Sequence, residues 1–300
     1  LLALLAEGDH FVKDLTEILG QSQPRVSRHL KLLADAGLIR RYAEGAWAYY
    51  GLAPAGEGGD LARWLIDRLD PSDAAYRGDR TRQAEIRAVQ QAEAAAYFAQ
   101  VAESWDLLKT LHVPEAAVEA AVLGALSGRQ VDLVIDLGTG TGRMLEVLAP
   151  AYKRGIGLDS SREMLAVARS RLASSGLAHA QVRLADIADL DADIGLGDVI
   201  VIHQVLHYFD DPGRMLAQAR TLLRPGGEIL IVDFAPHDLE FLRADHAHRR
   251  LGLSQEQMQG WAEAAGLVVR SSREFPSDNQ DRGLTVCLWH LGDRTNTDKA

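Results

Sequence analysis

An apolar segment that runs directly into a glycine-rich turn constrains this chain more than any other feature. Residues 131–142 read V-D-L-V-I-D-L-G-T-G-T-G. Apolar residues on both faces of a short segment are typical of a buried parallel strand. Glycines after such a strand let the backbone approach a ligand at the carboxyl edge of the sheet. Asp159 ends the next expected strand, where a carboxylate reaches ribose hydroxyls, so the pattern predicts a nucleoside-binding site.

The glycine spacing distinguishes two kinds of cofactor. A dinucleotide site has the pattern G-x-G-x-x-G, with the helix N-terminus facing a pyrophosphate. Here Gly138, Gly140 and Gly142 run G-x-G-x-G, and Arg143 takes the place of the third glycine. The pattern therefore disfavours a pyrophosphate. Asp136 precedes the first glycine, and we expect it at the tip of the strand, where it can pair with a cationic amino-acid group.

Four more motifs follow in order along the chain. They are G-I-G-L-D-S-S at 155–161, R-L-A-D-I at 183–187, D-V-I-V-I-H-Q-V-L-H-Y-F-D-D-P at 198–212 and L-R-P-G-G-E-I-L-I-V-D-F at 223–234. With the glycine turn, this set resembles the class I S-adenosylmethionine-dependent methyltransferases over roughly residues 97–292. The resemblance implies an α/β fold with a Rossmann-like, seven-stranded, mostly parallel sheet that ends in an antiparallel hairpin. We expect its strands at 131–137, 154–159, 180–185, 197–203, 227–234, 267–275 and 284–291.

The resemblance also implies that S-adenosylmethionine or S-adenosylhomocysteine is the cofactor. Asp136 and the amides of the glycine turn would contact its methionine part, Asp159 its ribose, and Asp186 with Ile187 its adenine edge. The full expected cofactor set is Asp136, Gly138, Thr139, Gly140, Gly142, Asp159, Ser160, Met164, Asp186, Ile187 and His203.

Three histidines are the candidate catalytic residues. Methyl transfer from a sulfonium is an in-line displacement, so the protein mainly orients the acceptor and excludes water. A base helps only where the acceptor must lose a proton. His203, His207 and His237 follow the expected fourth and fifth strands and titrate near neutrality as a residue type. Contact with the cofactor carboxylate, or capping of the next helix, is the alternative role for the first two.

Residues 234–252 raise the question of a metal site. His237, Asp238, His246 and His248 lie close together in sequence, but their spacing is poor for ligands on one helix face. We therefore expect no metal and instead a polar lid over the acceptor pocket.

The sole cysteine, Cys287, lies in an apolar run and excludes a disulfide framework. Related arsenic methyltransferases use several cysteines for their substrate, so that chemistry is also excluded by its usual route. We expect a reducing, cytoplasmic location.

No apolar stretch approaches the ~20 residues that a membrane span needs. The first residues, L-L-A-L-L, look like the middle of a helix.

The N-terminal residues predict a helix-turn-helix followed by a β-hairpin. A helix at 12–20 stops at Gly20, and Ser22 is expected to cap a second helix with Pro24 in its first turn. Val26, Leu30 and Leu33 form one inward stripe on that helix. The following alternating residues read as a hairpin that turns at residues 44–45.

The motif Q-S-Q-P-R-V-S-R-H-L-K-L-L-A-D-A-G-L-I at 21–39 resembles the ArsR/SmtB family of bacterial repressors over residues 1 to about 52. The resemblance implies a homodimer that binds double-stranded operator DNA. Residues 21–50 carry five basic and two acidic side chains, a local charge of +3 in a chain whose net charge is −10. The expected DNA-binding set is Gln23, Arg25, Ser27, Arg28, His29, Lys31 and Arg41. The alternative is a helical hairpin that serves only packing or dimerisation.

The N-terminal segment departs from the metal-sensing members of that family. Phe11 and Lys13 stand where arsenite sensors carry a cysteine pair, and the helix at 61–69 lacks the zinc-binding pattern. The attached cofactor-binding domain is therefore the candidate effector module. Two functions stay open: a regulator that also methylates an unidentified small acceptor, or a non-catalytic regulator that senses S-adenosylmethionine or S-adenosylhomocysteine.

Composition shifts suggest three parts. We expect a DNA-binding domain at 1–53, a helical linker and dimerisation region at 54–112, and a methyltransferase domain at 113–300. A long helix is expected over about 79–111. Tyr97, Phe98, Trp105 and Asp106 within it either contact the cofactor or pack the helix on the sheet.

Overall fold

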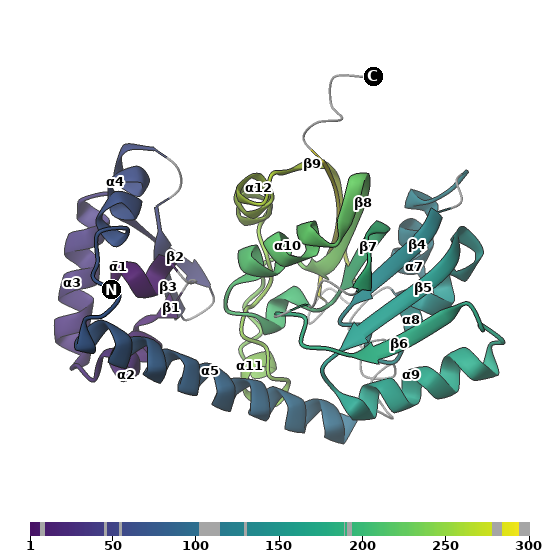
Figure 1. The fold of residues 1–300 in the computed structure, drawn as a ribbon, viewed down its shortest axis with the longest axis horizontal. Helices are drawn as coiled ribbons and strands as arrows, with labels where there is room; N and C mark the ends of the chain where they lie inside the picture. The colour runs from purple at the N-terminus through teal and green to yellow at the C-terminus, as the bar shows by residue number, and fades with distance from the viewer. Residues whose placement is uncertain are drawn as a thin grey trace. The chain divides into compact units, whose positions relative to one another are not determined.

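A computed structural model describes residues 1–6, 10–44, 47–53, 56–101, 115–128, 131–188, 190, 194–277 and 284–293. The chain divides into two compact units (Figure 1). The first comprises Leu1–Ala94 with Asp238–Asp245, and the second comprises Ala95–His237 with His246–Ala300.

The first unit combines helices with a small antiparallel sheet. Its elements are α1 (Leu2–Ala6), β1 (His10–Phe11), α2 (Val12–Leu19), α3 (Gln23–Asp35), β2 (Ile39–Glu44), β3 (Trp47–Leu52), α4 (Glu57–Ile66), the part of α5 (Ala74–Val101) that precedes Ala95, and the short α11 (Phe241–Asp245). The sheet has the order β1-β3-β2, and β2 pairs with β3 from Ile39 opposite Leu52 to Glu44 opposite Trp47. The expected helix-turn-helix and the two strands of the hairpin are thus present.

Local signals explain the turn between α2 and α3. Gly20 ends α2 with φ +60°, a left-handed conformation that favours glycine. Val26 and Leu30 are fully buried against Leu15 and Ile18 in one apolar cluster, and Leu33 packs against it. Ser22 does occupy the N-cap position of α3, but its side chain makes no capping hydrogen bond, so the expected side-chain cap is wrong.

The second unit is a three-layer α/β structure. Its elements are α7 (Glu115–Ala125), β4 (Val131–Leu137), α8 (Arg143–Leu148), η1 (Ala149–Ala151), β5 (Tyr152–Asp159), α9 (Arg162–Ser174), β6 (Ala180–Leu184), β7 (Gly197–His203), η3 (Leu206–Tyr208), α10 (Pro212–Thr221), β8 (Leu223–Phe234), α12 (Gln255–Ala264), β9 (Leu267–Phe275) and β10 (Val286–Asp293). The seven strands take the order β6-β5-β4-β7-β8-β10-β9. All seven predicted strands are confirmed, with ends that differ by at most four residues.

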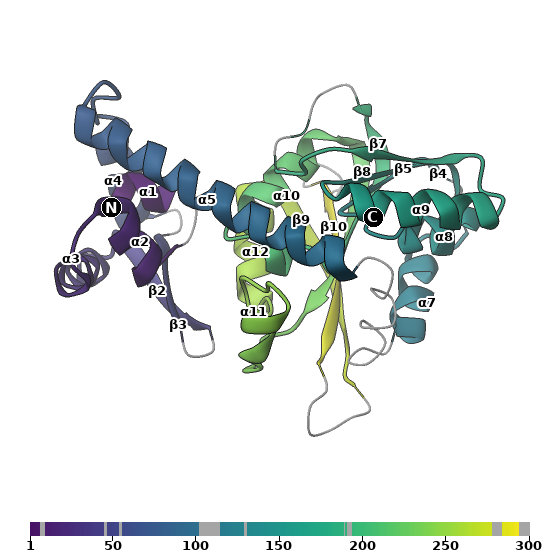
Figure 2. The ribbon, with the colours of Figure 1, turned by 90° about the horizontal axis from the view of Figure 1, so that it is seen from below.

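The strand order places the topological switch point of the sheet, between β4 and β7, beside the glycine turn. β6, β5, β4, β7 and β8 run parallel, and β10 pairs antiparallel with both β8 and β9. The chain winds outward in one direction from β4 and in the other from β7, so right-handed crossovers put α8 and α9 on one face and α10 and α12 on the other (Figures 1 and 2). Ligands of such sheets bind outside the carboxyl ends of the strands at this switch point.

The sheet interior carries the core of this unit. Ile135, Leu137, Ile200, Ile202 and Ile231 are fully buried in one cluster that also takes in α10 and α12. Apolar residues on both faces of β4, β7 and β8 are what a sheet covered by helices on both sides requires. Within the described part of the chain, the structure shows no helix with both the length and the apolar character needed to cross a bilayer.

Two expected segments differ from the structure. The long helix is α5, which starts at Ala74, five residues earlier than expected, and is described as far as Val101. The side chains of Tyr97 and Phe98, and the whole of Trp105 and Asp106, lie outside the described residues. The segment 234–252 forms only the five-residue helix α11, and its remainder runs as turns and extended chain.

Candidate functional site

The glycine turn between β4 and α8 folds over the end of β5. The backbone N–H groups of Gly138 and Thr139 both donate to the Leu158 carbonyl, at 2.8 and 2.9 Å. Gly138, Gly140 and Gly142 all have positive φ. Because L side chains rarely adopt that conformation, glycine at these positions keeps the turn tight.

Asp159, at the end of β5, is oriented by the same turn. Its Oδ2 accepts from the Gly140 backbone N–H at 2.8 Å, and its Oδ1 accepts from the Ser161 N–H at 2.8 Å. Burial raises the pKa of Asp159, and backbone N–H groups including those of Ser161 and Gly140 partly offset that rise. Each oxygen retains a second lone pair for a hydroxyl donor.

Asp136 is a buried carboxylate in β4, one residue before the strand ends. It is 1 % exposed, and its Oδ2 accepts from the Thr139 hydroxyl at 2.6 Å. Burial and the Asp136 carboxylate raise the pKa of Tyr152 in the neighbouring strand. The Thr139 side chain fits against Gly157 of β5, where a Cβ would lie 2.6 Å from its hydroxyl oxygen.

The remaining expected cofactor residues follow β5 and β6. Ser160 is exposed, and Met164 is buried with its N–H donating to Ser161 Oγ at 3.1 Å. Asp186 is exposed and accepts from the Ala188 N–H at 2.9 Å, which fixes the turn that buries Ile187. The structure thus places the expected set at or after the carboxyl ends of β4, β5, β6 and, for His203, β7. Asp186 is exposed to solvent.

The segment after β7 closes against the glycine turn. A Cβ on Gly138 would lie 2.4 Å from Val205 Cγ2, so only glycine leaves room for this contact. Gln204 has φ +54°, and its N–H donates to the Val232 carbonyl at 2.7 Å. Positive φ is uncommon outside glycine and concentrates at functional sites.

The three candidate catalytic histidines have different surroundings. His203 ends β7 and is buried, and His207 is buried in η3. His237 follows β8, is partly exposed and lies with its ring 6.1 Å from that of Phe234. The structure packs His207 against Tyr208 and Phe234, and no described ring contact joins it to His237.

His207 pairs with Asp233, and the sequence did not predict this pairing. The His207 Nδ1 lies 2.7 Å from Asp233 Oδ1, and the two side chains are 1 % and 0 % exposed. The His248 ring lies 4.1 Å from the His207 ring, between centroids. The sequence feature that could have drawn attention to Asp233 is a single aspartate near the carboxyl end of the apolar segment I-L-I-V-D-F.

The segment after α11 holds the 3-10 helix η3, which contains His207, in place. The backbone N–H groups of Arg249 and Arg250 both donate to the His207 carbonyl at 3.0 Å. The fully buried Arg250 guanidinium donates to the carbonyls of Phe209 and Asp210. The expected polar lid is therefore a clamp on η3, and the described residues contain no cluster of His, Cys, Asp or Glu that could hold a metal.

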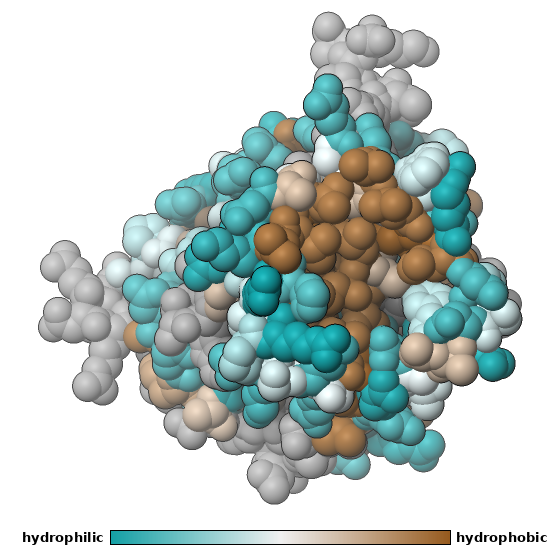
Figure 3. Space-filling model, turned by 90° about the vertical axis from the view of Figure 1, so that its left-hand side faces the viewer, coloured by the Kyte–Doolittle hydropathy of each residue, from teal (hydrophilic) through white to brown (hydrophobic). Residues whose placement is uncertain are grey.

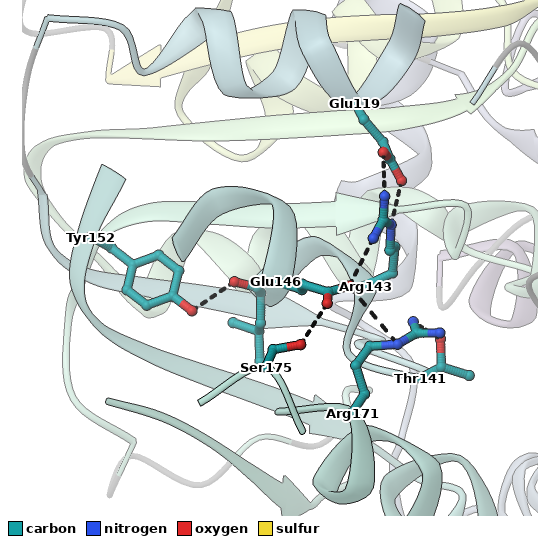
Figure 4. Close-up of polar contacts among 8 residues, drawn as sticks. Glu119, Thr141, Arg143, Glu146, Tyr152, Arg171 and Ser175 are labelled. Atoms are coloured by element: carbon teal, nitrogen blue, oxygen red, sulfur yellow. Dashed lines mark hydrogen bonds and ion pairs between the residues drawn. The ribbon is translucent and has the colours of Figure 1, made fainter. Parts of the chain in front are cut away.

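Arg143, which replaces the third glycine of a dinucleotide turn, belongs to a polar network that joins α7, α8 and the C-terminal end of α9 (Figure 4). Its Nε and one terminal nitrogen donate to the two Glu119 oxygens at 2.6 and 2.7 Å, and the other donates to Glu146 at 2.7 Å. Ser175 donates to Glu146, and Arg171 donates to Thr141 within the glycine turn. Burial raises the pKa of Glu146, but the hydrogen bonds from Ser175 and Arg143 lower it more.

We expect Arg143→Lys to destabilise the second unit by about 1 kcal/mol, because lysine cannot make the bidentate contact and the pair is partly exposed. The lowered pKa of Glu146 means that its contribution is present at neutral pH and is lost as the pH falls through that lowered value. Urea unfolding at pH 7 and pH 4 checks this, with Arg154→Lys, an exposed arginine of β5, as control. An unchanged midpoint for Arg143→Lys at pH 7 would contradict it.

Helix α3 and, through Arg41, strand β2 present the expected DNA-binding residues to solvent. Gln23, Arg25, Arg28, His29, Lys31 and Arg41 are exposed, and Ser27 is partly buried. The inward stripe of Val26 and Leu30 fixes which face is outward.

The first unit also exposes large apolar side chains, among them Leu32, Leu61, Trp64, Leu65 and Leu69. Three of them lie on one face of α4, at positions i, i+3 and i+4. Figure 3, which views the molecule from the left of Figure 1, shows a continuous apolar area. An apolar patch of this kind is typical of a protein contact surface.

Comparison with known proteins agrees with this two-part organisation. Residues 131–274 match the family model of a methyltransferase domain, and residues 1–41 match that of the bacterial regulatory proteins of the arsR family. An uncharacterised 37.1 kDa protein in transposon TN4556 of Streptomyces fradiae is 34 % identical, with 61 % of this chain and 56 % of that protein covered. A ubiquinone biosynthesis O-methyltransferase of Methylococcus capsulatus is 32 % identical over 41 % of this chain and 51 % of that protein. The chain thus spans about half the length of these relatives.

The fold has solved counterparts. The crystal structure of the YcgJ protein from Bacillus subtilis matches with a TM-score of 0.51 and 20 % identity, covering 59 % of this chain and 97 % of that one. At this identity the match concerns the fold alone. Residues 1–41 thus match the model of the arsR family of regulatory proteins, residues 131–274 match that of a methyltransferase domain, and the second of these parts shares the fold of the YcgJ protein.

Proposed function

We propose that this protein is a DNA-binding transcriptional regulator whose methyltransferase domain binds S-adenosylmethionine and methylates a small acceptor. The observation that carries the proposal is the arrangement of Asp159, whose two oxygens are aligned by the N–H groups of Gly140 and Ser161 at the carboxyl end of β5. A carboxylate there suits ribose hydroxyls, and the buried Asp136 suits the cationic amino group of the methionine part. One or more of His203, His207 and His237 would act as the base that takes a proton from the methyl acceptor.

Two measurements test the proposal. Calorimetric titration of the full chain should show binding of S-adenosylmethionine and S-adenosylhomocysteine in the micromolar range, about −8 kcal/mol. Incubation with methyl-labelled cofactor and a metabolite extract should yield a labelled small molecule. Absence of binding by both ligands would remove the proposal, whereas binding without any labelled product would favour a non-catalytic sensor.

We further propose that α3 reads the major groove of operator DNA and that the chain acts as a homodimer. The exposed Arg25, Arg28 and Lys31 supply positive charge along α3, and the apolar face of α4 suits a second copy of the chain. The single cysteine fits a reducing cytoplasm.

We expect Arg28→Ala to weaken operator binding about 10- to 100-fold and to lower the slope of log affinity against log salt by about one per half-site. The physical reason is the loss of one cation that displaces counterions or reads a base edge. Fluorescence anisotropy at several salt concentrations measures both quantities, and the titration also gives the number of chains per operator. Arg169→Ala, an exposed arginine of α9, is the control. Unchanged affinity and slope for Arg28→Ala would place the DNA contact elsewhere.

A further inference from the structure

The ring of His207 has one nitrogen paired and one nitrogen unpaired. Nδ1 lies 2.7 Å from Asp233 Oδ1, whereas Nε2 is buried without a partner among the described residues. A buried polar atom without a partner costs roughly 1–3 kcal/mol, so native structures rarely retain one without a reason.

Asp233 determines which nitrogen of His207 carries the proton. Its carboxylate also accepts from the backbone N–H of Phe234 at 2.8 Å and from that of His207 at 3.3 Å. An ionised carboxylate only accepts, so the hydrogen between the two side chains resides on Nδ1. Nε2 then presents a lone pair, as a base requires.

His207 follows closely after a residue that contacts the glycine turn. Val205, two residues before it, packs against Gly138 at the start of the glycine turn, where a Cβ would lie only 2.4 Å away. The clamp made by the N–H groups of Arg249 and Arg250 fixes the His207 carbonyl. The imidazole is thus positioned by groups on two sides, as precise proton transfer requires.

We propose that His207 Nε2 is the general base of the methyl transfer, that Asp233 is its positioning residue, and that the acceptor is a phenol-class hydroxyl. This inference rests on the proposed methyltransferase function. As the acceptor oxygen attacks the methyl carbon, the C–S bond breaks and its electron pair stays on sulfur. The hydroxyl proton passes to Nε2, so the products are the methyl ether, neutral S-adenosylhomocysteine and a protonated imidazole.

The chemistry of the site favours this acceptor class. An imidazole is matched to acceptors of moderate acidity, such as a phenol with a pKa of roughly 10, and is far too weak for an aliphatic alcohol. An arsenite acceptor held by protein thiolates is not supported, because the sole cysteine, Cys287, is buried in β10 opposite Asp233. Burial raises the pKa of that thiol to about 12, which keeps it protonated.

A series of phenols with graded acidity tests the proposal in the full-length chain. We expect Asp233→Asn and His207→Gln to lower kcat by about 100-fold or more for phenol itself, with cofactor Kd changed less than threefold. For nitrophenols that are already ionised at the assay pH, the defect should shrink to less than tenfold. Glu274→Gln, which removes an exposed carboxylate from β9, is the matched control.

An acceptor-independent measurement covers the case in which the buried variants fold poorly. Long-range ¹⁵N–¹H spectra of the wild-type chain should show His207 as the Nδ1–H tautomer, the less common form of a free imidazole. A protonated Nε2 at neutral pH overturns the proposal. Equal defects for neutral and ionised phenols, or cofactor binding with no phenol methylated, also overturn it, whereas loss of cofactor binding by the wild type removes the proposed function instead.

Discussion

Asp159→Asn should weaken S-adenosylmethionine binding about 100-fold while leaving the fold intact. The wild-type carboxylate presents two acceptor oxygens, each already aligned by one backbone N–H, whereas asparagine turns one of them into a donor. Hydrogen bonds to a charged group contribute about 1.5–3 kcal/mol each, and about 2.7 kcal/mol corresponds to that loss. Calorimetric titration measures it, with Glu256→Gln, an exposed carboxylate of α12, as control. Affinity within twofold of wild type would show that Asp159 does not hold the ligand.

The raised pKa of Asp159 adds a pH dependence to this result. Ribose hydroxyls donate best to the ionised form, so cofactor affinity should fall as the pH drops through the pKa of Asp159. Because burial raises that pKa, the fall begins above the ordinary aspartate value of about 3.9. The contribution of Asp159 to the free energy of unfolding depends on pH in the opposite direction. A carboxyl whose pKa is raised in the folded state stabilises the fold at low pH, where it is protonated, and destabilises it once it is ionised. The asparagine variant should therefore lose little stability at pH 7, and its residual binding should not respond to pH in this range.

Gly252→Ala should destabilise the second unit by about 3 kcal/mol or more and remove methyl transfer with it. A Cβ at this position would lie 2.1 Å from the Ala235 carbonyl oxygen and 2.5 Å from its carbon, which are backbone atoms that cannot rotate away. Its φ of +91° adds conformational strain. The flanking backbone pairs with the end of β8, through His237 N–H to the Leu251 carbonyl at 3.0 Å and Leu253 N–H to the Phe234 carbonyl at 2.8 Å. Displacing it would release the clamp on His207.

The matched control is Gly266→Ala. Gly266 follows α12 with φ +73°, but nothing lies within 4 Å of a Cβ there. Gly266→Ala therefore measures only the destabilisation that a positive φ causes in alanine, about 1 kcal/mol. Urea unfolding of both variants followed by circular dichroism separates strain from collision. Equal destabilisation of the two variants would mean that the Ala235 backbone moves to accommodate the added Cβ, which would contradict the prediction that this segment is rigid.

Several expectations from sequence were confirmed because they depend on local pattern. The seven strands follow from apolar runs bounded by glycine and proline, and α2 ends at Gly20 because that position needs a left-handed conformation. The outward face of α3 follows from Val26 and Leu30. The expected cap by the Ser22 side chain failed because a hydroxyl at an N-cap has competing rotamers that sequence does not rank.

The sequence by itself determined the sheet, the glycine turn and the carboxylates at its edge, because strand periodicity and turn chemistry act over a few residues. Only the tertiary structure decided which of the three candidate histidines is paired with a buried carboxylate. The pairing of His207 with Asp233 joins residues 26 apart in sequence, and the Arg249–Arg250 clamp reaches about 40 residues back to the same turn. Contacts of this kind arise when the strands are laid side by side, and no local pattern records which side chains will then meet.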